Sequence, residues 1–186
     1  MRRRHLLHGL LLGPWWLGGA VPRPAWAQAA TLSNLQLSRG DGHLLLDFAV
    51  RLALPRAVED ALQRGIPLYF VATATVRRER WYWRDRRIAR VRRTWRLAFQ
   101  PLTATWRVSL GALSQTHDTL PEALASLSAS AGWPVCELAQ LASEGDYVEF
   151  SYALDTEQLP RPMQIALPGA SEWALRIERE LKVPAS

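Results

Sequence analysis

Hydrophobic and polar residues alternate along most of the chain, a pattern typical of β-strands that place one face in a core. The longest such stretch runs from Ile66 to Ser109 and breaks only around residues 83–86. Its apolar positions are Leu68, Phe70, Ala72, Ala74, Val76, Ala89, Val91, Trp95, Leu97 and Phe99. The pattern predicts a long antiparallel hairpin with one apolar face, and Arg90, Arg92, Thr94 and Arg96 on the other.

Shorter segments complete the predicted fold. Alternating runs predict strands at residues 31–38, 44–52, 102–110, 148–154 and 173–181, and a short apolar run covers 133–138. An Asp-Gly pair after residue 40 marks a tight hairpin turn. One helix should begin at Pro55 and end at Gly65, and a second should begin near Thr119, with Glu122 completing a capping box, and end at Gly132. These elements predict a mainly β domain, an antiparallel β-sandwich or curved sheet with two short helices.

Residues 1–27 are typical of a signal peptide. Three arginines at residues 2–4 precede an apolar stretch, and Ala25-Trp26-Ala27 fits the small-x-small cleavage pattern. We therefore predict export to the periplasm and a mature chain, residues 28–186, that forms a single β-rich domain without a stable membrane span. An uncleaved N-terminal anchor is the alternative.

Charge is concentrated in the predicted hairpin. Four of the 23 basic residues and none of the 17 acidic ones lie in residues 1–27, so the mature chain has a net charge of +2. Ten arginines fall between Arg77 and Arg96, against only Glu79 and Asp85. The pattern predicts a positive face on a mildly acidic body.

Residues able to support catalysis or bind metal are sparse. The mature chain has His43 and His117 and a single cysteine, Cys136, without the spacing of a zinc site. Residues 109–118 contain two serines, a histidine and an aspartate, the types needed for acyl transfer, but a polar loop and helix cap explain them more simply. We expect no enzymatic activity, no metal and no cofactor, and we expect Cys136 to be a buried apolar residue.

Arginine and aromatic side chains are interleaved around the middle of the hairpin. The candidate binding residues are Arg77, Arg80, Trp81, Trp83, Arg90, Arg92 and Arg96. Such a surface fits an anionic component of the cell envelope or an acidic receptor domain, and a solvated outer face is the simpler alternative. Single-stranded nucleic acid would suit the same chemistry, but export argues against it.

Several segments resemble a family of exported proteobacterial proteins, domain of unknown function 4390. They are "RAVEDALQRGIPLYFVATATVRRERWYW", "RTWRLAFQPLTATWRVSLGALSQTHDTLPEALASL" and "LDTEQLPRPMQIAL". The resemblance implies an envelope location, no established activity and no assigned catalytic residues. It also implies a gene neighbourhood that includes a membrane-bound sensor kinase. We therefore expect a non-catalytic binding or accessory module that tunes such a sensor, with a periplasmic carrier or chaperone for an apolar or lipidic ligand as the alternative.

Overall fold

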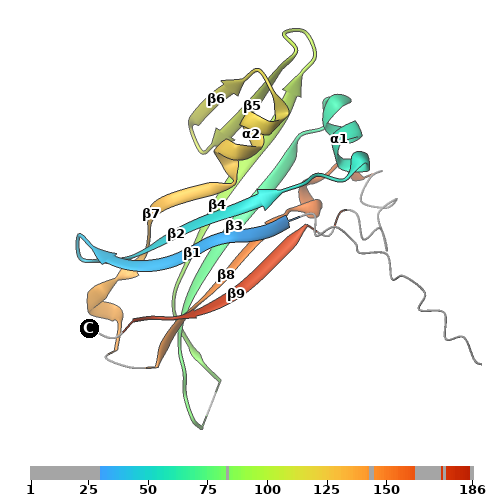
Figure 1. The fold of residues 1–186 in the computed structure, drawn as a ribbon. Helices are drawn as coiled ribbons and strands as arrows, with labels where there is room; N and C mark the ends of the chain where they lie inside the picture. Colours follow the sequence, from blue (N-terminus) through green and yellow to red (C-terminus); the bar gives the residue numbers. More distant parts are fainter. Residues whose placement is uncertain (1–29, 83, 143–144, 162–172, 174, 185–186) are drawn as a thin grey trace, which may run out of the picture.

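The computed structural model describes residues 30–184 except 83, 143–144, 162–172 and 174. Within these residues the chain forms two antiparallel sheets, as the alternation predicted (Figure 1). The predicted signal peptide and the candidate residue Trp83 lie outside the described residues. Among the helices that are described, none is long and apolar enough to cross a membrane.

The smaller sheet has three strands and the larger one six. The smaller sheet has the order β1 (Ala30–Gly40), β2 (His43–Leu52) and β7 (Ala129–Glu137). The larger sheet has the order β6 (Leu113–His117), β5 (Thr105–Leu110), β4 (Arg86–Gln100), β3 (Leu68–Arg78), β8 (Asp146–Leu154) and β9 (Arg176–Lys182). The helices are α1 (Arg56–Gln63) and α2 (Leu120–Leu127), with single 3-10 turns at Leu138–Gln140 and Thr156–Gln158.

Aromatic rings fill the space between the two sheets. Phe48 from β2 packs against Trp95 of β4 and Phe150 of β8, with ring centroids 6.1 and 5.0 Å apart. Tyr152 of β8 and Trp133 of β7 also contact Phe48. Most inward positions of β2, β3, β4 and β8 are apolar, so the predicted faces of the long hairpin are confirmed.

Both helices begin and end for local reasons. In α1, Val58, Ala61 and Leu62 form the buried stripe. The helix closes where the N–H of Ile66 donates to the carbonyl of Ala61, with Gly65 at a φ of 82°. Only glycine adopts that conformation at low cost. At the start of α2 the Thr119 hydroxyl accepts a hydrogen bond from the N–H of Glu122, as the sequence predicted.

Three predicted boundaries are wrong. The strand expected at residues 173–181 begins at Arg176 and ends at Lys182. The strand expected from residue 102 begins at Thr105, because residues 101–104 form a turn in which Leu102 is fully exposed and Ala104 has a φ of 53°. The helix expected to end at Gly132 ends at Leu127, because Ala129–Glu137 pairs with β2 as β7. Gly132 instead lies at an irregularity in that pairing, with a φ of 60°, and its N–H donates to the Asp47 carboxylate.

Candidate functional site

The predicted arginine face is the outer face of β4 in the larger sheet. In the register, Thr73 of β3 lies opposite Arg92, and Thr75 lies opposite Arg90. Even-numbered residues of β4 therefore point away from the smaller sheet, and Arg90, Arg92 and Arg96 are all exposed. The sequence thus placed these three arginines on the correct face.

Acidic residues of the same sheet neutralise part of this face. Arg77 Nε lies 2.7 Å from Glu149 Oε2, and Arg92 Nη2 lies 2.9 Å from Asp155 Oδ2. The side chains of Arg77 and Glu149 are 34% and 45% exposed, so water screens the pair. The partners come from β8 and the residue after it, which the sequence pattern could not place beside the hairpin.

A shallow polar groove runs along the outer face of β3 and β8. It has a volume of about 510 Å³, and Thr73, Thr75 and Ser151 lie between Arg90 on one side and Glu180 of β9 on the other. Neither Arg90 nor Arg96 has an ion-pair partner among the described residues. The outer face is therefore a surface of separated charges, on which some of the arginines are paired with carboxylates and others are not.

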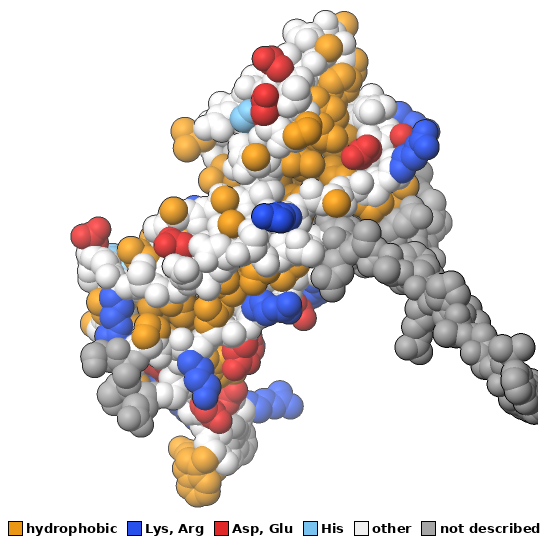
Figure 2. Space-filling view, in the orientation of Figure 1, with side chains coloured by type: hydrophobic (Ala, Val, Ile, Leu, Met, Phe, Trp, Pro, Cys, Tyr) orange, Lys and Arg blue, Asp and Glu red, His pale blue; other side chains and the backbone are white. Residues whose placement is uncertain are grey.

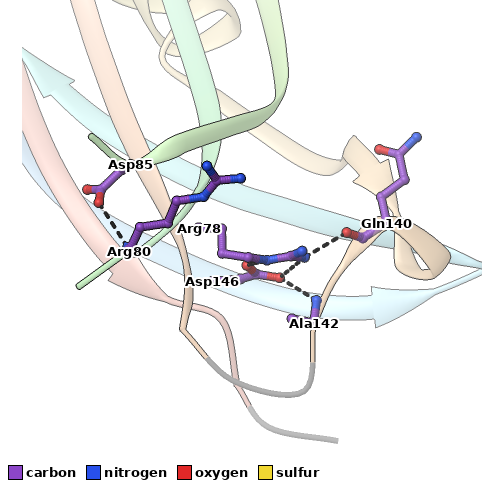
Figure 3. Close-up of polar contacts among 6 residues, drawn as sticks. All are labelled: Arg78, Arg80, Asp85, Gln140, Ala142 and Asp146. Atoms are coloured by element: carbon purple, nitrogen blue, oxygen red, sulfur yellow. Dashed lines mark hydrogen bonds and ion pairs between the residues drawn. The ribbon is translucent and has the colours of Figure 1, made fainter. Parts of the chain in front are cut away.

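Arg78, the neighbour of Arg77, points to the opposite face and forms a buried ion pair with Asp146. Its Nε and Nη2 lie 2.8 and 3.1 Å from the two carboxylate oxygens, and Nη2 also donates to the carbonyl of Gln140 (Figure 3). Burial raises the pKa of Asp146, but the bonds from Arg78 and the Ala142 N–H outweigh it and leave the pKa below its ordinary value. This pair stabilises the base of the hairpin.

Arg93 is a second arginine of the hairpin that points inward and does not belong to the outer arginine face. It occupies an inward position of β4 between Val91 and Trp95, and its guanidinium lies 5.1 Å from the centre of the Trp133 ring. It also donates to the Ser130 hydroxyl, and burial lowers its pKa. In the sequence, the only sign of this inward position was that Arg93 is two residues from both Val91 and Trp95, which also point inward.

The end of the β3–β4 hairpin extends beyond the rest of the sheet (Figure 1). Pairing with β8 ends where Arg78 meets Asp146, so the described residues 79–82 and 84–85 do not pair with β8. Trp81 and Tyr82 are 93% and 66% exposed, and their rings form an edge-to-face pair with centroids 5.0 Å apart. Figure 2 shows a hydrophobic cluster at this end of the molecule.

Hydrogen bonds hold the residues beside the exposed rings in place. The Asp85 carboxylate accepts from the Tyr147 hydroxyl at 2.5 Å and from the Arg80 N–H at 3.3 Å. Both hydrogen bonds lower the pKa of Asp85, and the bond from Tyr147 has the larger effect. The Glu79 N–H donates to the carbonyl of Gly145. The aromatic pair is therefore presented by a braced turn, and Arg80 contributes to the bracing through its backbone.

The residues considered for acyl transfer do not come together. They also do not form the polar loop expected, because Ser109 lies in β5, and Ser114 and His117 lie in β6. Ser109 and Ser114 have their hydroxyl oxygens 3.2 Å apart on one face of the β5–β6 pair. His117 pairs with Trp106 and so points to the opposite face. Cys136 is buried, as predicted, and burial together with the charge of Asp146 raises its pKa to about 11. Within the described residues, no group of three or more potential metal ligands is found.

One comparison with known proteins gives a match. A family model described as "Domain of unknown function (DUF4390)" matches residues 27–181. No curated protein and no solved structure matches the chain.

Proposed function

Since the chain belongs to the DUF4390 family, whose description gives no function, we propose that it is a non-catalytic binding module of the cell envelope. Its docking element is the β3–β4 hairpin, with the exposed Trp81 and Tyr82 at its end and the outward arginines of β4. In the periplasm this element would contact an anionic envelope component or an acidic receptor domain, such as that of a membrane sensor kinase.

The exposed aromatic pair at the end of the hairpin is the observation that carries this proposal. Large aromatic side chains are normally at least partly buried, and Trp, Tyr and Arg are the residues that contribute most to binding interfaces. Here Trp81 and Tyr82 are exposed on a turn that Asp85 and Gly145 hold in place. A braced turn loses little conformational entropy on binding, which favours a docking role over a solvated wall.

The interior packing favours a binding module over a carrier of apolar ligands. A carrier would need an apolar cavity between the sheets, and Phe48, Trp95, Trp133, Phe150 and Tyr152 fill that region with contacting rings. The larger grooves along the described residues lie on the outer face of the six-stranded sheet and are lined mainly by polar and charged side chains.

Crosslinking in the native envelope tests the proposal. One variant, Trp81→Ser with Tyr82→Ser, removes the rings; a second replaces Arg90, Arg92 and Arg96 by Gln. Both should melt close to the wild type, because exposed positions tolerate such changes within about 0.5 kcal/mol each. The first should lose the captured partners, and the second should capture them more weakly, with a smaller dependence on salt.

Leu102→Ser is the matched control, because it removes a fully exposed apolar side chain at the other end of β4. It should leave capture unchanged. If both hairpin variants fold and still capture the same partners as the wild type at the same salt concentration, the hairpin is not the docking element.

A further inference from the structure

We propose that the end of the β3–β4 hairpin inserts into the interfacial layer of an anionic phospholipid bilayer, with Trp81 and Tyr82 at the boundary between headgroups and acyl chains. The inference rests on the proposed function and specifies the partner of the docking element. Four features of the described residues support it: the ring chemistry, the flanking arginines, their separation from the rings, and the small size of the protruding end.

Trp and Tyr are the side chains that favour membrane–water interfaces. Each combines a large apolar ring with a polar N–H or O–H, so the ring can leave water while the polar group remains hydrated. Trp81 and Tyr82 are exposed side by side in the turn between β3 and β4. Figure 1 shows that this end of the hairpin extends beyond the sheet, and Figure 2 shows hydrophobic side chains at the same end of the molecule.

Arginines lie immediately behind the aromatic pair. Arg84, Arg86 and Arg87 are exposed, and none of them has an ion-pair partner among the residues that the structure describes. Arg86 and Arg87 also line a hollow of about 280 Å³ together with Arg78 and Gln140. Guanidinium groups bind phosphate oxygens through paired hydrogen bonds, so this hollow suits the phosphate of a lipid headgroup.

The spacing of rings and arginines fits the thickness of the headgroup layer. Arg86 is four positions after Tyr82 in the sequence, which corresponds to at most about 13 Å of extended chain. Each headgroup layer of a bilayer is roughly 5–8 Å thick. Rings at the acyl boundary therefore place the guanidinium groups of Arg86 and Arg87 at the phosphates or just outside them.

The small size of this end favours a bilayer over a folded protein partner. Two aromatic side chains bury roughly 300–500 Å² together. A stable protein–protein interface needs about 800 Å² on each side. A narrow projecting end can bury about 800 Å² against a protein only if the partner has a deep pocket of matching shape. A bilayer can surround the same end without a preformed pocket.

Vesicle sedimentation tests the inference, using the protein in the form that cells export. The vesicles contain either phosphatidylcholine alone or equal parts of phosphatidylcholine and phosphatidylglycerol. The wild type should sediment with the anionic vesicles and be released by salt. Trp81→Ser with Tyr82→Ser should lower partition at least tenfold. Arg86→Gln with Arg87→Gln should lower it about fivefold per charge. Leu102→Ser should bind like the wild type.

A second measurement reports the position of the ring. Trp83 is replaced by Phe in every protein compared, so that its fluorescence does not contribute. Trp81 is exposed, whereas Trp95, Trp106, Trp133 and Trp173 are buried, so lipids brominated near the top of the acyl chain should quench Trp81 rather than these four. Trp81→Phe keeps an apolar ring, so it should still bind but show less quenching. Unchanged quenching in Trp81→Phe would place the ring outside the bilayer and overturn the inference.

The outcomes also separate this inference from the proposed function. If the aromatic variant loses a crosslinked protein in the native envelope while the wild type ignores anionic vesicles, the hairpin docks on a protein and the lipid inference is wrong. If the aromatic variant sediments with vesicles as well as the wild type, the lipid inference is wrong. If it also captures the same envelope partners at full yield, the end of the hairpin has no docking role either.

Discussion

Replacing Arg78 by Met should destabilise the fold far more than replacing its neighbour Arg77 by Met. Both arginines form ion pairs of similar length, 2.8 Å to Asp146 and 2.7 Å to Glu149. They differ in their surroundings: the Asp146 side chain is 2% exposed, whereas that of Glu149 is 45% exposed. Methionine keeps a long unbranched side chain at either position, so the substitution removes the charge and its hydrogen bonds while leaving most of the side-chain packing in place.

The expected magnitudes follow from burial. Removing one partner of a buried ion pair costs about 3–5 kcal/mol, because the remaining charge is left without compensation. Arg78 is itself 30% exposed, so we expect the lower end, about 3 kcal/mol. A screened surface pair contributes less than about 1 kcal/mol. Against a typical stability of roughly 5–15 kcal/mol, the Arg78 variant should be visibly weakened and the Arg77 variant should not.

The effect should also depend on pH in a defined direction. In the wild type the folded-state pKa of Asp146 is depressed, so its stabilisation is complete above about pH 3.9 and is lost as the pH falls through the folded-state pKa. Without Arg78, burial should raise that pKa above the unfolded value. The difference between wild type and variant should therefore be full at neutral pH and shrink as Asp146 becomes protonated.

Urea denaturation followed by tryptophan fluorescence measures both effects. Wild type, Arg78→Met and Arg77→Met are compared at about pH 7 and about pH 4. Equal destabilisation by the two substitutions would refute the argument from burial. A loss in Arg78→Met that is the same at both pH values would show that the Asp146 charge does not cause it.

Three further predictions concern the core, the cysteine and the mature chain. Trp95→Ala and Trp106→Ala should each cost about 3–5 kcal/mol, measured as lower denaturant midpoints, because both rings are buried; unchanged midpoints would contradict their place in the core. Cys136 should react slowly with thiol reagents near neutral pH and rapidly once the chain is unfolded, because burial and a pKa of about 11 suppress the thiolate. Mass spectrometry of the exported protein should find an N-terminus at or near Gln28.

The sequence predicted local features well wherever one strong pattern governed them. Strict alternation gave the inward and outward faces of β3 and β4, including the exposure of Arg90, Arg92 and Arg96. A capping residue gave the start of α2, and a glycine with positive φ gave the end of α1. The errors occurred where the alternation of apolar and polar residues continued past the end of a strand. Leu102 fits the alternation, but it lies in a turn.

Interactions between distant segments lay beyond the reach of the pattern. Residues 129–132 were expected to form the end of a helix, and pairing with β2 makes them part of the strand β7. Strand β8 likewise decides how the hairpin is divided. It supplies Glu149, which neutralises part of the outer face, and its pairing with β3 ends at Asp146, so the aromatic end extends beyond it.

The sequence by itself therefore determined which residues are hydrophobic enough to form the core, which alternate, and where the arginines and aromatic residues concentrate. Only the tertiary structure decided that Arg78 pairs with a buried carboxylate while Arg77 pairs with an exposed one, that Arg93 packs on Trp133, and that Trp81 is exposed. The physical reason is that burial and charge compensation depend on strands far away in the chain, and their pairing is set by the packing of the whole sandwich.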